Sequence, residues 1–282
     1  NNYEIPGIIY KQDGVIKKIA PEKPIEDMDS IPFPARDLLN NKKYTSVISK
    51  YSPITILFSG RGCQYHCTFC SKPDFWNYWR FASPNYVVNE IEQCLNLGIK
   101  EILIYDDVFT AYPKRVKAIC NEIVNRGLDV HFDIRTRVDM VNPTILSYLR
   151  RAGCLRVNYG VESGDPDMLK RYQKNYTIEQ VKKAFEITKK SGMDTLAYFM
   201  IGGPGETTES VGRTFRLIKY LDPDYLHLTY VIPYPKTELF KTAIQMKLAD
   251  EDFWLKKENL LKEYPLMFES SDLTKEQILK SV

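Results

Sequence analysis

The chain has 282 residues, and 44% of them are hydrophobic, which is enough for one large core or two small ones. Its 39 Lys and Arg residues nearly balance its 36 Asp and Glu residues, so the net charge of +3 does not indicate a nucleic-acid partner. No apolar run approaches the roughly 18 residues of a membrane span, and the N-terminus does not resemble a signal peptide. These features predict a cytoplasmic protein without a membrane span.

After about residue 50, short β-rich segments alternate with helical ones, which is the pattern of βα units and a parallel sheet. The predicted strands are Ile54–Phe58, Glu101–Tyr105, Asp129–Ile134, Leu155–Gly160, Asp194–Ile201 and Asp224–Val231. The predicted helices are Asn85–Leu97, Pro113–Arg126, Pro143–Arg151, Thr177–Ser191, Thr208–Leu221 and Thr237–Leu248. Proline near helix starts, as at Pro84, and glycine just past helix ends, as at Gly98 and Gly153, support these limits.

Each predicted strand is followed by a short group of polar, glycine or proline residues. The groups are Ser59–Cys63, Asp106–Asp107, Arg135–Arg137, Val161–Gly164, Gly202–Gly205 and Pro233–Pro235. Consecutive βα units fit either an open doubly wound sheet or an incomplete barrel. In barrels the functional residues gather on the loops that follow the strands, so these groups favour the barrel. We therefore predict an α/β fold built as a partial (β/α)6 barrel of the TIM type.

The two ends of the chain lack this alternation. Residues 1–50 are predicted to form a β-hairpin that turns at Asp13-Gly14, followed by a proline-rich connector. Residues 51–247 are predicted to form the barrel, and residues 248–282 a polar helical extension. Because the chain starts with Asn and not with Met, we expect it to be a piece of a longer protein.

Three of the six cysteines, Cys63, Cys67 and Cys70, lie on one loop directly after the first predicted strand. This spacing does not resemble the disulfide framework of a secreted protein and indicates a metal site. Thiolates suit zinc or an iron–sulfur cluster, and a cubane cluster with only three cysteines keeps one iron open for another ligand. A zinc site completed by His66 is the alternative, although His66 directly precedes Cys67 and no second ligand cluster follows. The other three cysteines are predicted to be buried and inert.

The C-x3-C-x2-C spacing, with the aromatic Phe69 before the last cysteine, resembles the radical S-adenosylmethionine (SAM) superfamily. The resemblance implies a partial (β/α)6 barrel and a catalytic [4Fe–4S] cluster whose metal ligands are Cys63, Cys67 and Cys70. It also implies that SAM chelates the open iron. One electron, from an external donor such as flavodoxin or ferredoxin, then cleaves SAM to a 5′-deoxyadenosyl radical that acts on an unidentified substrate.

The same resemblance puts the SAM contacts on the barrel rim. The predicted contacts are Phe69, Asp106, Asp107, Arg137, Glu162, Ser163, Gly202 and Gly203. The two adjacent aspartates suit the ammonium and sulfonium of SAM, and they also suit a helix N-cap. Arg137 is predicted to hold a carboxylate of SAM or of a substrate by a bidentate fork, with a surface ion pair as the alternative for Arg137 or Arg135. The two glycines suit a tight turn that lets the backbone approach the adenosine.

The segment Ser30–Leu39 and the motifs Gly-Val-Glu-Ser-Gly and Met-Ile-Gly-Gly-Pro-Gly-Glu resemble the cobalamin-binding group of radical SAM enzymes. This group includes methylases and the anaerobic porphyrin ring cyclase. Because the chain contains no Asp-x-His-x-x-Gly motif, the resemblance implies that cobalamin binds through a domain absent from this chain. The expected function is SAM cleavage for cobalamin-dependent methylation or a related C–H functionalisation. The alternatives are a radical SAM methylthiotransferase and a non-enzymatic metal-binding module.

Overall fold

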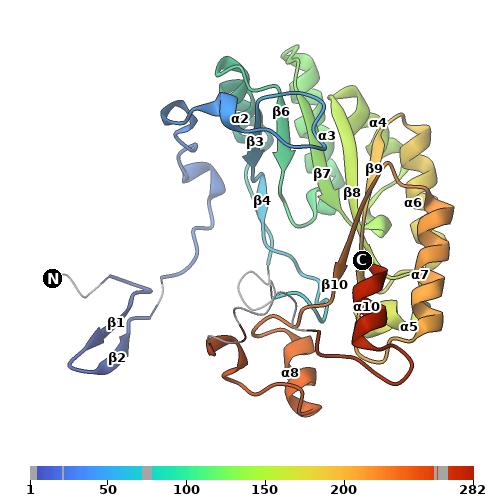
Figure 1. Ribbon diagram of the computed structural model, residues 1–282. Helices are drawn as coiled ribbons and strands as arrows, with labels where there is room; N and C mark the ends of the chain where they lie inside the picture. The colour runs from blue at the N-terminus through green and yellow to red at the C-terminus, as the bar shows by residue number, and fades with distance from the viewer. Residues whose placement is uncertain (1–4, 21, 72–77, 257–258, 260–265) are drawn as a thin grey trace.

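The computed structural model describes the chain except residues 1–4, 21, 72–77, 257–258 and 260–265. At its centre is a six-stranded sheet in which all neighbouring strands are parallel (Figure 1). The strands are β3 (Ile54–Leu57), β6 (Glu101–Ile104), β7 (His131–Thr136), β8 (Cys154–Glu162), β9 (Asp194–Ile201) and β10 (Tyr225–Tyr230). They follow one another across the sheet in chain order, without the reversal that a doubly wound sheet requires. The prediction of a partial barrel is therefore confirmed.

Helices cover one face of this sheet (Figure 1). They are α2 (Pro84–Asn96), α3 (Pro113–Asn125), α4 (Pro143–Arg151), α6 (Ile178–Lys190) and α7 (Thr208–Leu221). Their apolar sides pack against the strands, so that Val88 and Ile91 of α2 share one buried cluster with Ile102 and Ile104 of β6. The main core thus lies between the sheet and the helices, which leaves the opposite face of the sheet for polar side chains.

The sequence does not predict several short elements near the rim. Helix α5 (Pro166–Arg171) lies between β8 and α6, and the hairpin of β4 (Gly60–Arg61) and β5 (Arg80–Phe81) flanks the cysteine loop. Strands of two residues are too short to show an alternating pattern. Strand β8 continues to Glu162, two residues beyond its predicted end, and β7 begins at His131 and not at Asp129.

The N-terminal hairpin is confirmed. Strand β1 (Ile9–Gln12) pairs antiparallel with β2 (Val15–Lys18), and the hairpin stands apart from the sheet in Figure 1. Asp13 and Gly14 have φ angles of 49° and 80°, so both occupy the left-handed region that a two-residue type I′ turn requires.

The connector after this hairpin crosses the barrel at the amino ends of the strands. The backbone N–H groups of Lys50 and Tyr51 donate to the Glu101 carboxylate at 2.8 and 2.7 Å. The Tyr51 ring stacks on His131 at a centroid distance of 3.9 Å, and Arg156 donates to the carbonyl of Ile48 at 2.7 Å. These contacts close the end of the barrel opposite the cysteine loop.

The prediction of a helical C-terminal extension is wrong for much of its described part. After α8 (Glu238–Gln245), the described residues include the short helices η6 (Phe253–Leu255) and α10 (Lys275–Ser281), and residues 266–274 are irregular. Met267 and Phe268 are buried, and their apolar side chains pack this irregular segment against the barrel. The polar composition of the segment does not predict this packing. Part of the predicted extension lies outside the described residues. No helix in the described part of the chain is long and apolar enough to cross a membrane.

Candidate active site

The three cysteines of the loop after β4 are thiols, each partly buried. The N–H of Cys70 donates to the carbonyl of Cys67 at 3.0 Å, which makes a turn around these two residues. Between them, Thr68 anchors the loop in two directions, because its N–H donates to the Tyr172 carbonyl at 3.3 Å and its carbonyl accepts from the Leu239 N–H at 2.9 Å. The loop is therefore fixed to the end of α5 and the start of α8.

The electrostatics of this loop fit a group that carries positive metal ions. Burial raises the pKa of the Cys63 thiol to about 11, and the nearby Asp107, Cys67 and Cys70 add to the increase. A bound metal centre reverses this effect because it stabilises thiolates. No three His, Cys, Asp or Glu side chains among the described residues converge on a single ion. Three thiols on one short loop are soft donors of the kind that an iron–sulfur cluster or zinc takes.

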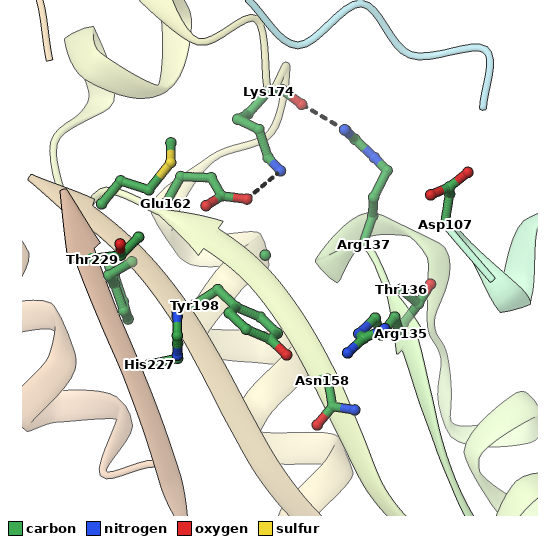
Figure 2. Close-up of a pocket in the computed structure, with 13 residues that line it drawn as sticks. Asp107, Arg135, Thr136, Arg137, Asn158, Glu162, Lys174, Tyr198, His227 and Thr229 are labelled. Atoms are coloured by element: carbon green, nitrogen blue, oxygen red, sulfur yellow. Dashed lines mark hydrogen bonds and ion pairs between the residues drawn. The ribbon is translucent and has the colours of Figure 1, made fainter. Parts of the chain in front are cut away.

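Beside the loop, the carboxyl ends of β7 to β10 surround a cavity of about 360 Å³ (Figure 2). Its lining residues are Asp107, Arg135, Thr136, Arg137, Asn158, Gly160, Glu162, Lys174, Tyr198, Phe199, Met200, His227 and Thr229. The cavity thus brings together three of the predicted SAM contacts, Asp107, Arg137 and Glu162. The other five do not line it, namely Phe69, Asp106, Ser163, Gly202 and Gly203.

A β-bulge brings Glu162 into the cavity. The register between β8 and β9 shifts between Gly160 and Glu162, and Glu162 has a φ of 69°. Such bulges redirect side chains at the rims of barrels. Its carboxylate forms an ion pair with Lys174 Nζ at 3.1 Å, and only 5% of Lys174 is exposed. Burial alone would lower the pKa of Lys174, but the negative charge of the Glu162 carboxylate reverses the sign and raises it. Lys174 Nζ also lies 5.6 Å from the centroid of the Phe69 ring, so Lys174 lies between the cavity and the cysteine loop.

The guanidinium of Arg137 forms hydrogen bonds with other groups of the protein. Its Nε and Nη2 donate to the two carboxylate oxygens of Asp139 at 2.9 and 3.0 Å. Nη2 also donates to the Lys174 carbonyl at 2.6 Å (Figure 2). The bidentate fork of Arg137 thus holds a carboxylate of the chain in this structure, in an ion pair whose arginine is buried and does not lie at the surface. Its Nη1 is buried and has no hydrogen-bond partner among the described residues. The two N–H donors of Nη1 are left for a ligand.

The two neighbouring aspartates differ in their surroundings. Asp106 is 2% exposed and accepts hydrogen bonds from the N–H groups of Ser59 and Gly60 at 2.7 and 2.9 Å and from the Ser59 hydroxyl at 2.6 Å. Burial raises the pKa of Asp106 to about 6 despite these bonds. Asp106 thus fixes the start of the segment that carries the cysteines, while Asp107 lines the cavity. Phe69 packs edge-on against Tyr172 at a centroid distance of 5.6 Å.

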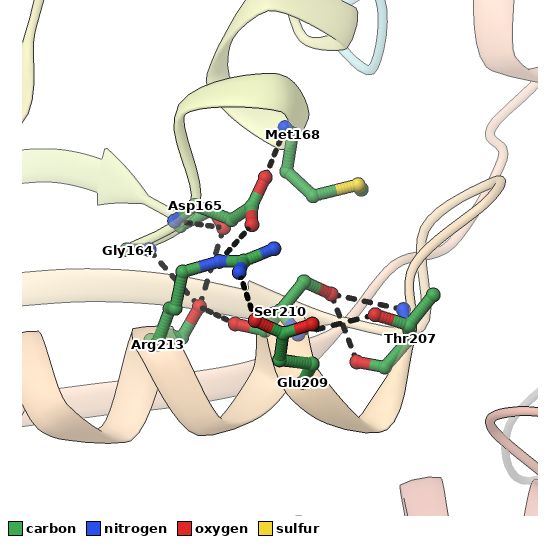
Figure 3. Close-up of polar contacts among 9 residues, drawn as sticks. Gly164, Asp165, Met168, Thr207, Glu209, Ser210 and Arg213 are labelled. Atoms are coloured by element: carbon green, nitrogen blue, oxygen red, sulfur yellow. Dashed lines mark hydrogen bonds and ion pairs between the residues drawn. The ribbon is translucent and has the colours of Figure 1, made fainter.

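The glycine-rich turns after β8 and β9 are held by internal contacts. Ser163 is fully buried and contacts the Thr214 hydroxyl of α7, which also accepts from the Gly164 N–H at 3.0 Å (Figure 3). The N–H groups of Gly202 and Gly203 both donate to the Glu206 carboxylate, at 2.5 and 3.1 Å. Their roles toward SAM stay predictions, and in this structure these groups stabilise the turns.

The sequence pattern of the Radical SAM superfamily matches residues 57–218, which is more than half of the chain. The chain belongs to the radical SAM superfamily. Members of this superfamily are enzymes that use SAM and a [4Fe–4S] cluster. The matched segment contains the cysteine loop and the parts of β7 and β8 that line the cavity.

Two relatives of this radical SAM chain are described as a methyltransferase and as a cyclase. The chain is 35% identical over 254 residues to an uncharacterized methyltransferase of Pyrococcus horikoshii, covering 89% of this chain and 55% of the relative. It is 32% identical over 241 residues to the anaerobic magnesium-protoporphyrin IX monomethyl ester cyclase of Rubrivivax gelatinosus, covering 84% and 43%. The chain therefore spans about half the length of the curated relatives that it matches.

Solved structures of the superfamily share this fold. The cobalamin-dependent radical SAM enzyme OxsB, with aqua-cobalamin and SAM bound, matches all of this chain and 46% of its own, with a TM-score of 0.78 and 20% identity. The methyltransferase TsrM from Kitasatospora setae, with cobalamin and a [4Fe–4S] cluster bound, matches 95% of this chain and 56% of its own, with a TM-score of 0.71 and 20% identity.

Several cavity residues of this radical SAM chain are absent from the sequence-based prediction of its site. Asn158, Tyr198, His227 and Thr229 lie within strands, and the prediction considered mainly the loops after them. Alternation along the strands could have found them, because residues two apart face the same side of a sheet. Lys174 had no such signal, since it follows α5 on a loop.

Proposed function

We propose that this radical SAM chain binds a [4Fe–4S] cluster on Cys63, Cys67 and Cys70 and SAM in the adjoining cavity. The observation that carries the proposal is the buried Lys174, which pairs with Glu162 of the cavity and lies 5.6 Å from the Phe69 ring of the cysteine loop. When bound, the cluster supplies the electron that splits SAM into methionine and a 5′-deoxyadenosyl radical.

The residues of the chain have separate tasks in this proposal. Asp107 and Glu162 attract the cationic ammonium and sulfonium of SAM, since opposite charges interact strongly in a partly desolvated cavity. Lys174 balances the negative charge of the thiolate-ligated cluster and of Glu162, with which it pairs. The buried Nη1 of Arg137 gains an acceptor in the carboxylate of SAM, which removes the cost of leaving it unpaired. Tyr65, whose ring lies 3.7 Å from the Arg137 guanidinium, shields this region from water.

For the whole protein we propose cobalamin-dependent methylation or a related C–H functionalisation. The methyltransferase and cyclase relatives and the cobalamin-bound structural neighbours support this proposal. Cobalamin then binds through a domain outside this chain, the electron comes from an external donor such as flavodoxin or ferredoxin, and the reaction takes place in the cytoplasm. After incubation with hydroxocobalamin and desalting, this chain should lose the vitamin and a chain extended upstream should retain it. Loss from both would contradict the cobalamin proposal.

The test of the site combines iron content with SAM affinity. Anaerobically reconstituted protein should hold about four irons. Cys67→Ala should lose the cluster, whereas Cys94→Ala, at a buried cysteine of α2, should keep it. Glu162→Gln should keep the iron and weaken SAM binding, measured by calorimetry, because it removes a charge that faces the ligand. Stoichiometric zinc with no iron–sulfur absorption, or unchanged SAM affinity in Glu162→Gln, would contradict the proposal.

A further inference from the structure

Three charged residues alternate along β7 and its end, and they face the inside of the half-barrel. Asp133, nearest the closed end, pairs with Arg156 at 2.5 Å. Arg137, at the rim, pairs with Asp139. Arg135 lies between them and forms no ion pair with a carboxylate in the part of the chain that the structure describes. Its guanidinium carbon instead lies 3.2 Å from the centroid of the Tyr105 ring. This cation in the cavity wall therefore lacks an anionic partner among the residues that the structure describes.

The side chains around Arg135 are hydrogen-bond donors. Asn158 lies opposite Arg135 in the β7–β8 register, and its Oδ1 accepts from Arg156 Nε at 3.1 Å. Its amide NH2, which can only donate, is on the side of Arg135 in Figure 2. Tyr198 lines the same cavity as Arg135, and the ring centroids of Tyr198 and His227 are 5.2 Å apart. The part of the cavity around Arg135 thus contains one cationic side chain and several hydrogen-bond donors.

The acidic side chains of the cavity lie at a different level. Glu162 stands at the carboxyl end of β8 and is neutralised by Lys174, and Asp107 follows β6 at the same rim (Figure 2). Arg135 is two residues before Arg137, which corresponds to about 6.6 Å along a strand. The cysteine loop is also at the rim, so a SAM molecule that chelates the cluster keeps its carboxylate there, near Arg137 and not near Arg135.

We propose that Arg135 binds an oxyanion of the substrate, a carboxylate, phosphate or phosphonate, in the middle of the half-barrel. Asn158, Tyr198 and His227 supply further donors. This inference rests on the proposed function, because it takes SAM to occupy the rim. A guanidinium forms bidentate hydrogen bonds with planar and tetrahedral oxyanions alike. The substrate is then an acidic molecule whose reacting carbon lies between this anchor and the SAM site.

The test uses methylphosphonate as the probe. It is titrated into anaerobically reconstituted, SAM-saturated protein, and binding is followed by phosphorus NMR. The wild type should bind it saturably, and Arg135→Gln should raise the Kd roughly tenfold or more, the usual effect of losing a charged hydrogen bond. Arg135→Lys should lie between the two because it keeps the charge without the fork. Arg150→Gln, an exposed arginine of α4, is the matched control and should bind as the wild type does.

Iron content and SAM affinity are measured in the same samples. Both should be unchanged in Arg135→Gln. The inference is overturned if Arg135→Gln binds methylphosphonate as tightly as the wild type, or if it loses SAM affinity, since Arg135 would then serve the SAM carboxylate. A wild type that binds SAM but no methylphosphonate also overturns it and leaves the proposed function standing. Binding of methylphosphonate through Arg135 without any binding of SAM supports the subsite and counts against the proposed function.

Discussion

Glu206 is a buried carboxylate at the centre of a glycine-rich turn. It is 1% exposed, and its Oε2 accepts from the N–H groups of Gly202 and Gly203. Its Oε1 is buried without a hydrogen-bond partner among the described residues. Burial raises the pKa of Glu206 to about 7, although the two backbone bonds act in the opposite direction. The side chain therefore holds the turn best when it is protonated.

This shift predicts how stability depends on pH. A carboxyl whose pKa is higher in the folded than in the unfolded state binds protons more tightly when folded, so its contribution is present below about pH 4.5 and is lost as the pH rises through about 7. Glu206→Gln keeps an acceptor for the two N–H groups and cannot ionise. Relative to the wild type, its free energy of unfolding in urea should therefore increase from pH 5 to pH 8. Glu209→Gln, on the exposed side of α7, is the control, and a constant difference between Glu206→Gln and the wild type would contradict the assignment.

Some residues of the site can be predicted from the sequence, and others cannot. Asp107 and Glu162 follow predicted strands, so the rule that barrel sites form on these loops was enough to select them. Lys174 lies between Gln173 and Asn175, which both have a φ of 55°, and this turn directs its side chain toward Glu162. A lysine on a polar loop normally faces solvent, and only the folded turn shows that this one does not.

At the scale of elements, two glycines near the end of β8, Gly160 and Gly164, have different structural roles. A Cβ on Gly160 would come within 2.5 Å of the Glu162 carboxylate, the end of a flexible side chain. A Cβ on Gly164 would come within 2.6 Å of the Thr214 backbone in α7, which cannot move alone. One glycine makes room for a side chain of the cavity, and the other allows close packing of a turn on a helix.

Substitution of these two glycines should affect SAM binding and the stability of the fold separately. Gly160→Ala should displace the Glu162 carboxylate and weaken SAM binding several-fold, with a small change in the urea midpoint. Gly164→Ala should lower the midpoint clearly, because overpacking against backbone costs about 1–3 kcal/mol. Calorimetry with SAM and urea unfolding of both variants give the comparison. If Gly160→Ala were the less stable variant and bound SAM normally, the described role of the bulge would be wrong.

The elements that the sequence predicts well are those with a long hydrophobic pattern. The buried β6 and β9 and the helices α3 and α7 lie within one or two residues of their predicted limits. The bulge in β8 escaped prediction because one extra residue does not change the apolar pattern that precedes it. Residues 266–274 are fixed by apolar contacts with a distant part of the chain, and such contacts have no local signal.

At the scale of the whole molecule, the connector before β3 is fastened to the barrel by a buried ion pair. Arg36 Nη2 donates to Glu90 of α2 at 2.7 Å and to the Ile56 carbonyl at 2.8 Å, and its Nε donates to the Thr55 hydroxyl at 3.0 Å. Both members of the pair are about 95% buried. A boundary at residue 50 stays a prediction, but this pair and the contacts of Lys50 and Tyr51 make the connector contribute to the stability of the barrel.

Glu90→Ala tests whether this connection stabilises the whole fold. The substitution leaves Arg36 buried with its charge uncompensated, which costs roughly 3–5 kcal/mol in comparable pairs. The urea midpoint should fall accordingly, and fluorescence and circular dichroism should still show one common transition, because the connector and the barrel unfold together. Glu186→Ala breaks the exposed pairs of Glu186 with Lys183 and Lys190 and should cost less than about 1 kcal/mol. An uncompensated buried charge lowers the free energy of unfolding substantially. Similar small losses in both variants would therefore mean that the connector lies against the barrel without stabilising it.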